Sequence, residues 1–110
     1  MPPSRNLVPV EFVSEAVIRQ HFNEGRFWER VQSGDLRADL KRNGHPATLP
    51  AGEPSCTHSQ TLNYYASNGE LIAVVHQYKR PDGSLGGSGR PDPKWLSLSG
   101  RALAVRSRIK

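Results

Sequence analysis

The Asn68-Gly69 dipeptide lies in the middle of a segment, 57–80, that is rich in β-branched, aromatic and aliphatic residues. Asn-Gly is the strongest short-range signal for a β-hairpin, because both residues accept the positive φ angles of a two-residue turn. Such a turn pairs Ser67 with Glu70 and thereby fixes the register of the whole hairpin. The expected opposed pairs are Leu62 with Val75, Tyr64 with Ala73, Thr61 with His76, and Ser59 with Tyr78.

The two faces of this hairpin differ in chemistry, because successive side chains of a strand point to opposite sides. One face is apolar and is expected to pack on the N-terminal helices; it carries Leu62, Tyr64, Leu71, Ala73 and Val75. The other face begins with Tyr65, Ile72 and Val74 and becomes polar, with Ser59, Thr61, His76, Tyr78 and Arg80 at its end. We therefore predict that His76, Tyr78 and Arg80 project from one side, next to the loop that follows.

The N-terminal part of the chain shows helical spacing. Apolar residues at 13, 17 and 18 predict a helix over 10–22, with Pro9 in its first turn. A second short helix is expected around Phe27, Trp28 and Val31, and a third helical turn over 35–42, before Asn43-Gly44. The Pro, Gly, Ala and Thr residues that follow predict a linker over 45–55.

The C-terminal part predicts two more strands, Lys94–Ser99 and Ala102–Arg108, joined at Ser99-Gly100-Arg101. We therefore predict an α+β fold in which two or three N-terminal helices pack on a small antiparallel sheet of about four strands. With 110 residues, the chain is expected to form a single domain, 1–110. Its expected parts are a helical half, 9–44, the linker, 45–55, and a β half, 56–108.

The formal charge of +5 is unevenly distributed, because five cations and no acid follow Asp92. A basic terminus attracts phosphates, although a solvated tail is the alternative interpretation. The longest aliphatic run, Leu71 to Val75, is far shorter than a membrane span, and the N-terminus shows no apolar signal segment. The single cysteine, Cys56, cannot form an internal disulfide, as is typical of a reducing compartment. We therefore expect a cytoplasmic protein without a membrane partner.

The loop that follows the hairpin repeats Arg-Pro-Asp at 80–82 and 90–92, around a glycine cluster. Two interpretations stay open. In the first, Pro81-Asp82-Gly83 and Pro91-Asp92-Pro93 specify tight turns that give the loop a fixed shape. In the second, the backbone amides of 86–89 turn inward beside Arg90 and bind an anion.

The polar end of the hairpin contains the parts of a metal-independent ribonuclease. His76 can exchange a proton near neutral pH, Tyr78 can donate a hydrogen bond, and cations can stabilise a phosphate. The predicted catalytic residues are His76, Tyr78 and Arg80. The predicted contacts to phosphate or nucleic acid are Arg80, Gly87, Ser88, Gly89, Arg90 and Lys94. Cys56-Thr57-His58 lacks the second pair of a structural zinc site, so we expect neither a metal nor a cofactor.

These features favour a small basic protein that interacts with nucleic acid, with RNA preferred over DNA. Its enzymatic version is a metal-independent RNase or toxin-like domain, and Tyr65 and Tyr78 can stack bases in either version. The alternative is a non-enzymatic interaction module, such as an accessory protein of a phage or mobile element, that presents the 80–94 loop to an acidic protein surface. The residues leave open whether the protein is an enzyme and what its oligomeric state is.

Overall fold

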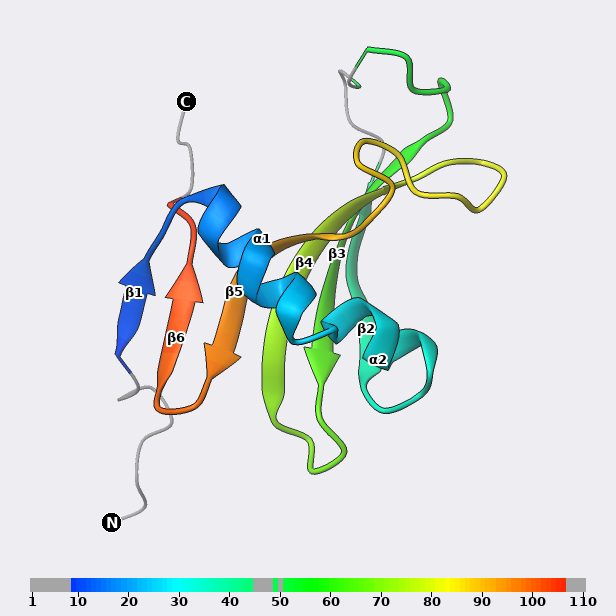
Figure 1. Ribbon diagram of the computed structural model, residues 1–110. Coiled ribbons are helices and arrows are strands. Elements are labelled where there is room, and N and C mark those ends of the chain that lie inside the picture. The colour runs from blue at the N-terminus through cyan, green and yellow to red at the C-terminus, as the bar shows by residue number, and fades with distance from the viewer. Residues whose placement is uncertain (1–8, 45–48, 50, 107–110) are drawn as a thin grey trace.

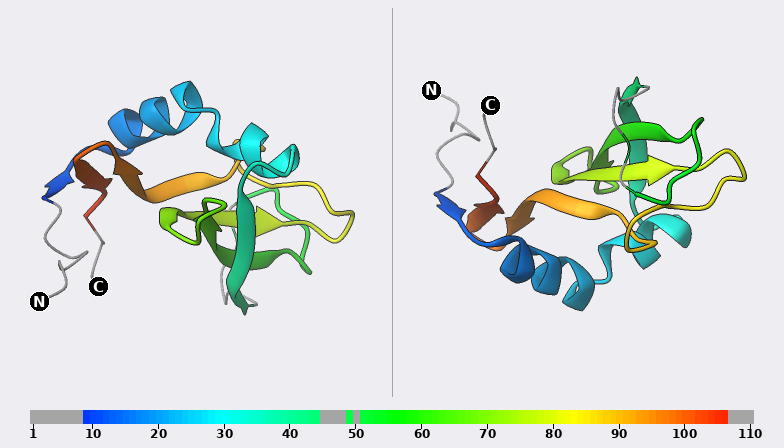
Figure 2. Two further views of the ribbon diagram at one scale, coloured as in Figure 1. Left: turned by 90° about the horizontal axis from the view of Figure 1, so that it is seen from below. Right: turned by 90° about the horizontal axis from the view of Figure 1, so that it is seen from above.

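The computed structural model describes residues 9–44, 49 and 51–106. In chain order the elements are β1 (Val10–Phe12), α1 (Glu15–Glu24), α2 (Phe27–Gln32), β2 (Arg37–Gly44), β3 (His58–Tyr65), β4 (Leu71–Lys79), β5 (Asp92–Leu98) and β6 (Arg101–Ala104). The strands form one sheet in the order β1-β6-β5-β4-β3-β2, and both helices lie on the same side of it (Figures 1 and 2). Neither of these helices is long and apolar enough to cross a membrane.

The predicted fold class is therefore wrong. The sheet has six strands instead of about four, and it is mixed, because β1 runs parallel to β6 while the other neighbouring pairs are antiparallel. The described chain has two short helices, and strands β1 and β2 both lie within the part that was expected to be helical. The sheet is thus built from both ends of the chain and not from a separate β half.

The first helix begins later than its apolar spacing predicts. Ser14 is extended, with φ −70° and ψ 161°, and its Oγ accepts a hydrogen bond from the Val17 amide at 3.2 Å. A serine in this position satisfies one of the free amides of the first turn, so the helix starts immediately after it. Residues Val10–Phe12 form β1 instead, where Val10 lies opposite Ala102 of β6.

The second predicted helix is confirmed as α2, whereas the third helical turn, over 35–42, is wrong. Leu36, Ala38 and Leu40 alternate with polar residues, which is the spacing of a strand. Arg37–Gly44 accordingly forms the edge strand β2, in which Ala38 lies opposite Tyr64 of β3. Positions 45–48 and 50 of the predicted linker lie outside the described residues, and 51–55 contains no helix or strand.

The hairpin of β3 and β4 confirms the predicted register. Ser59, Thr61, Leu62 and Tyr64 lie opposite their expected partners on β4. The two-residue turn is wrong, because the Ala66 amide donates to the Glu70 carbonyl at 2.9 Å and the Gly69 amide donates to the Ala66 carbonyl at 2.9 Å. Ser67, Asn68 and Gly69 thus form the loop, and Gly69 has a φ of +88°, which glycine adopts without a steric cost. A shift of register between Tyr64 and Tyr65 accommodates the longer loop.

The C-terminal strands confirm the predicted turn at Ser99-Gly100. β5 begins at Asp92, earlier than predicted, and β6 ends at Ala104; positions 107 and 108 of the predicted strand lie outside the described residues.

The core lies between the two helices and one face of the sheet. Its buried side chains are Ile18, Phe22, Phe27, Leu36, Tyr64, Ala73, Val75, Leu96 and Leu103. The Phe22 and Phe27 rings stack with their centroids 5.7 Å apart, and the Tyr64 centroid lies 6.2 Å from that of Phe22. The aromatic residues of α1, α2 and β3 therefore hold the helices on this side and leave the other face of the sheet without a helix.

Candidate functional site

The face of the sheet that points away from the helices is the candidate site, and we call it the open face. Directly opposed residues of neighbouring strands point to the same side of a sheet. Ala73 and Leu96 are opposed and both 0% exposed, so they mark the helix side. The next pair, Val74 and Trp95, points to the open face, and so does Tyr65, which follows the buried Tyr64. Neither α1 nor α2 lies over this face (Figure 2).

The open face carries aromatic and polar side chains in two groups. Tyr65, Val74 and Trp95 lie toward one end, and Ser59, Thr61, His76 and Tyr78 lie toward the end near the 80–94 loop. All seven are half-buried. The partly buried apolar residues that pack against the core do not include Val74 or Trp95, but they include Ile72, so the prediction that Ile72 lies on the open face is wrong.

Tyr65 is held in place by two neighbours on this face. The Arg37 guanidinium of the edge strand β2 lies 4.8 Å from the centre of the Tyr65 ring. The Asn63 side-chain amide donates to the Tyr65 hydroxyl at 3.1 Å. A ring that is fixed in this way loses little side-chain entropy when a flat ligand stacks on it.

His76 is at the centre of the polar end. Its Nε2 lies 2.7 Å from the Oγ of Ser59 on the neighbouring strand. Its ring meets that of Tyr78 edge to face, with the centroids 4.8 Å apart and an interplanar angle of 85°. The imidazole is thus oriented from two sides.

Burial and the nearby Lys94 ammonium lower the pKa of His76 below its usual value of 6.5, and Asp92 opposes this effect. The folded protein therefore favours the neutral imidazole. In the unfolded chain the same group binds a proton more readily, so the unfolded state holds more protons between the two pKa values. The contribution of the neutral imidazole to the free energy of unfolding is complete above about pH 6.5. It is lost as the pH falls toward the pKa that His76 has in the folded protein.

We expect the free energy of unfolding of the intact chain to fall between about pH 7.5 and about pH 5.5 more steeply than that of His76→Gln, which cannot titrate. Denaturant titrations of both proteins across this range measure the difference. Parallel pH curves would show that His76 has the same pKa in the folded and unfolded states.

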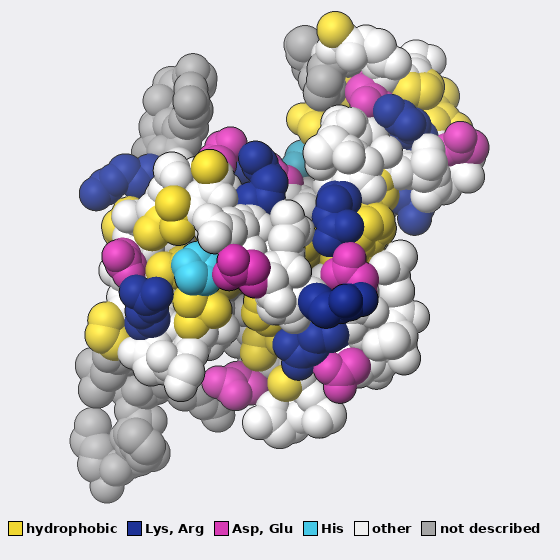
Figure 3. Space-filling view, in the orientation of Figure 1, with side chains coloured by type: hydrophobic (Ala, Val, Ile, Leu, Met, Phe, Trp, Pro, Cys, Tyr) yellow, Lys and Arg dark blue, Asp and Glu magenta, His cyan; other side chains and the backbone are white. Residues whose placement is uncertain are grey.

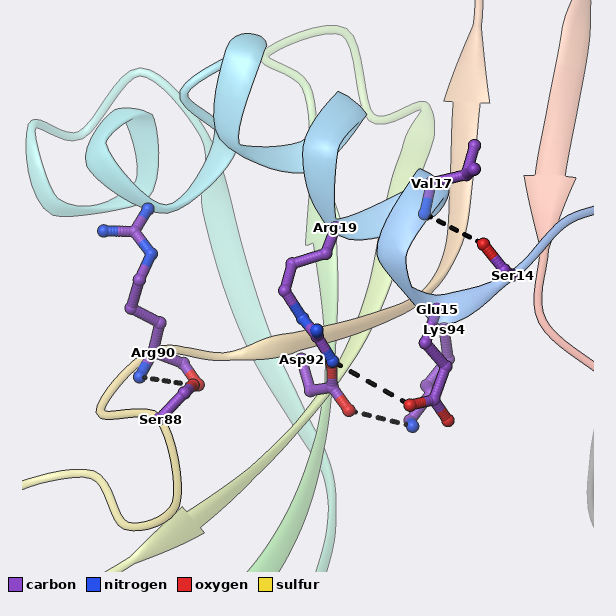
Figure 4. A network of polar contacts seen from close by, with 8 residues as sticks. All are labelled: Ser14, Glu15, Val17, Arg19, Ser88, Arg90, Asp92 and Lys94. Atoms are coloured by element: carbon purple, nitrogen blue, oxygen red, sulfur yellow. Dashed lines mark hydrogen bonds and ion pairs between the residues drawn. The ribbon is translucent and has the colours of Figure 1, made fainter.

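Asp92 and Lys94 connect this end of the open face to helix α1. Lys94 Nζ lies 3.0 Å from Asp92 Oδ2, and the Arg19 guanidinium lies 3.2 Å from Asp92 Oδ1. Arg19 Nη2 also lies 3.8 Å from Glu15 Oε1 in the same helix. Figure 4 shows Arg19 reaching from α1 to Asp92, with Lys94 on the other side of this carboxylate.

The 80–94 loop has the fixed shape of the first interpretation. Asp82 Oδ1 accepts from the amide and the hydroxyl of Ser84 at 2.9 and 2.6 Å, and the Arg80 amide donates to the Ser84 carbonyl at 2.9 Å. A second turn follows, in which the Gly89 amide donates to the Gly86 carbonyl at 3.1 Å. The tight turn that Pro81-Asp82-Gly83 predicts is thus confirmed, whereas the turn expected at Pro91-Asp92-Pro93 is wrong, because Asp92 and Pro93 already belong to strand β5.

The second interpretation puts an anion on the amides of 86–89 beside Arg90, but the Gly87 amide binds the Glu53 carboxylate, which lies beside Arg80 instead. Arg80 Nε and Nη2 donate to the two Glu53 oxygens at 2.9 and 3.2 Å, and the Gly87 amide donates to Oε2 at 3.0 Å. The Glu53 side chain is only 5% exposed, and these donors hold its pKa below the usual 4.5. A Cβ at position 86 would lie 2.5 Å from Glu53 Oε1, so the close approach of this carboxylate requires glycine there.

Arg90 is paired on the helix side. Its guanidinium lies 4.7 Å from the Trp28 ring and donates to Glu29 Oε2 at 3.0 Å, while Arg90 Nε and Glu29 Oε1 are buried without a hydrogen-bond partner among the described residues. Figure 3, which views this side, shows Lys and Arg side chains next to Asp and Glu side chains. The helix side is therefore a surface of mixed charge.

The structure brings together some of the predicted site residues and separates others. His76 and Tyr78 are in contact, and Lys94 is close enough to lower the pKa of His76. Arg80 and Arg90 bind carboxylates elsewhere, and the Gly87 amide binds Glu53. Ser88 and Gly89 are exposed in the second turn, where the Ser88 hydroxyl contacts the backbone of Arg90 (Figure 4). The catalytic and phosphate-binding roles of these residues stay predictions.

Three relevant residues were not among the predicted site residues. Ser59 could have been found from the hairpin register, which places it diagonally beside His76 on the same face. Nothing in the local sequence links Glu53 to Arg80 or Glu29 to Arg90, because these partners are distant along the chain. Among the residues that the structure describes, no three His, Cys, Asp or Glu side chains are grouped as a metal site.

Comparisons with known proteins give no match: no family model, no curated protein and no solved structure is similar to this chain.

Proposed function

We propose that the open face binds single-stranded RNA. The observation that carries the proposal is that the rings of Tyr65, Trp95, His76 and Tyr78 share a sheet face that neither helix covers. Unpaired bases stack on aromatic side chains of exposed sheet faces, and each such contact is worth about 1–3 kcal/mol. Partly exposed aromatic rings suit unpaired bases better than they suit a duplex, whose bases are stacked on one another.

Cations at the border of the open face supply contacts for phosphates. Arg42 is exposed opposite Thr61. Arg37, over Tyr65, pairs with Asp39 at 3.2 Å, and Lys94, near His76, pairs with Asp92 at 3.0 Å. The side chains of Arg37 and Lys94 are nevertheless 64% and 38% exposed, so both stay accessible to a phosphate. Three phosphate contacts to a single strand correspond to a slope of about −2 in a plot of log affinity against log salt. RNA binding is compatible with a cytoplasmic location, which stays a prediction.

The two tryptophans allow the proposed surface to be tested directly. In Trp28→Phe the remaining tryptophan, Trp95, lies on the open face, whereas in Trp95→Phe the remaining one, Trp28, lies under Arg90 on the helix side. We expect an oligoribonucleotide of about ten residues to quench the fluorescence of Trp28→Phe, because a base stacks on Trp95. The fluorescence of Trp95→Phe is expected to change little.

Equal quenching of the two variants would place the RNA elsewhere on the protein. The titration is run at about 50 mM and about 200 mM salt, because phosphate contacts lose affinity between these concentrations. Absence of binding at the lower concentration would contradict the proposal.

The second candidate is an interaction module that uses the 80–94 loop. It is favoured by the fixed shape of the turn around Asp82, whose tip residues are exposed. A fixed loop binds a partner without a large loss of conformational entropy. This candidate predicts that replacing Pro81 and Asp82 with alanine abolishes capture of the partner and leaves RNA titrations of both tryptophan variants unchanged.

A further inference from the structure

The geometry around His76 is that of a base prepared to accept a proton from a hydroxyl group. The Ser59 hydroxyl lies 2.7 Å from His76 Nε2, which is within the range of a hydrogen bond through which a base activates a nucleophile. The edge-to-face contact with Tyr78 fixes the plane of the imidazole. The position in front of Nε2 is thus one that a hydroxyl oxygen can occupy.

The groups that face His76 favour its neutral form. From β5, Lys94 lowers its pKa and Asp92 raises it; from β4, its neighbour is the Tyr78 ring; from β3, its neighbours are the uncharged Ser59 and Thr61. Arg42 of β2 is one strand further away, opposite Thr61. A neutral imidazole is the state in which histidine acts as a general base near neutral pH.

We infer that the open face also cleaves the RNA that it binds, with His76 Nε2 taking the proton of a ribose 2′-hydroxyl at the position that the Ser59 hydroxyl occupies in the free protein. This inference rests on the proposed function, since it requires RNA on the open face. The oxygen O2′ forms a bond to the adjacent phosphorus, and the bond from this phosphorus to O5′ breaks.

The reaction balances without a metal or a second substrate. The leaving O5′ takes a proton from solvent water, and His76 afterwards releases the proton that it accepted. The products are a 2′,3′-cyclic phosphate and a 5′-hydroxyl end. The Lys94 ammonium, which is close enough to shift the pKa of His76, provides positive charge for the phosphate oxygens as negative charge develops on them.

The test uses the whole chain and an end-labelled single-stranded RNA in the presence of a chelator, with the products identified by mass spectrometry. We expect cleavage to the cyclic phosphate, and a rate that falls on acidification as His76 becomes protonated. Removal of a general base typically costs about 10²–10⁴-fold in rate, so His76→Ala is expected to lose at least about 100-fold. His76→Gln, which keeps a polar side chain in the sheet, replaces it if His76→Ala does not fold.

Ser59→Ala is the matched variant, because it removes the hydroxyl that hydrogen-bonds to His76 Nε2. It leaves the base in place, so it is expected to give the same cyclic product. Cleavage of an RNA in which every 2′-hydroxyl is methylated, lost in a folded Ser59→Ala, would make Ser59 the nucleophile and would overturn direct attack by the ribose. Cleavage that persists in His76→Ala would overturn the role of His76.

Binding is measured separately with RNA in which every 2′-hydroxyl is methylated, because this ligand stacks normally and cannot attack its own phosphate. Binding of this analogue, together with failure to cut ordinary RNA, would overturn the inference and leave the proposed function intact. Failure to bind either ligand would overturn the proposed function, and the inference with it.

Discussion

Replacing Phe22 with alanine is expected to lower the free energy of unfolding by about 3–5 kcal/mol, the usual cost of removing a buried phenylalanine. Phe22 is 0% exposed, and its ring stacks on Phe27 and lies 6.2 Å from the Tyr64 centroid. Its removal leaves a cavity among α1, α2 and β3, which close only partly around it. Denaturant titration followed by circular dichroism measures the change.

Val17→Ala provides the control on the same helix. Val17 is 39% exposed, so its truncation is expected to change the free energy of unfolding by less than about 1 kcal/mol. Small domains have a total stability of about 5–15 kcal/mol, so the loss in Phe22→Ala removes a large part of it. Equal effects of the two substitutions would show that the helices do not depend on this aromatic contact.

The hairpin could be predicted because its signals are local. Asn68-Gly69 and the alternating side chains on either side determine which residues of β3 and β4 face one another. The exact loop could not be predicted, since Asn-Gly also suits a loop in which glycine alone has a positive φ. A shift between Tyr64 and Tyr65 then absorbs the extra residue without altering the pairs beyond it.

The two outer strands were missed for different reasons. β1 is three residues long and gains its hydrogen bonds from β6 at the other end of the chain. β2 pairs with β3 in the sheet, but along the chain the two strands are separated by the segment whose composition predicted a linker. Over the three residues of β1, apolar spacing does not distinguish a helix from a strand, so pairing with β6 decides the outcome. In β2 the alternation of Leu36, Ala38 and Leu40 does indicate a strand, and the prediction of a third helical turn did not use it.

The candidate site could be predicted only as far as strand alternation reaches. Alternation places Ser59, His76 and Tyr78 on one face, and the register then brings Ser59 next to His76. The Arg80 guanidinium binds Glu53, which is distant in sequence. A guanidinium that can bind a phosphate binds an internal carboxylate equally well. Cations in a sequence therefore indicate a phosphate site only after their carboxylate partners are known.

Removing both outer rings of the open face is expected to have the largest effect on RNA binding. In the double variant Tyr65→Ser, Trp95→Ser two stacking contacts are lost, each worth about 1–3 kcal/mol, so the affinity is expected to fall at least about 30-fold. Arg37 loses the ring on which it lies, which adds to the effect. Fluorescence anisotropy of a labelled oligoribonucleotide at constant salt measures the affinity.

The matched control keeps an aromatic ring at each position and removes the polar atoms. Tyr65→Phe, Trp95→Phe loses the hydrogen bond from Asn63 and the indole N–H, yet it preserves two flat surfaces on the open face. If stacking provides the affinity, this control binds RNA within a few-fold of the intact chain while the double serine variant does not. A double serine variant that is folded by circular dichroism and binds as tightly as the intact chain would show that the rings of the open face do not contact RNA. The cations around them would then have to account for the affinity, and the salt slope of about −2 would persist unchanged.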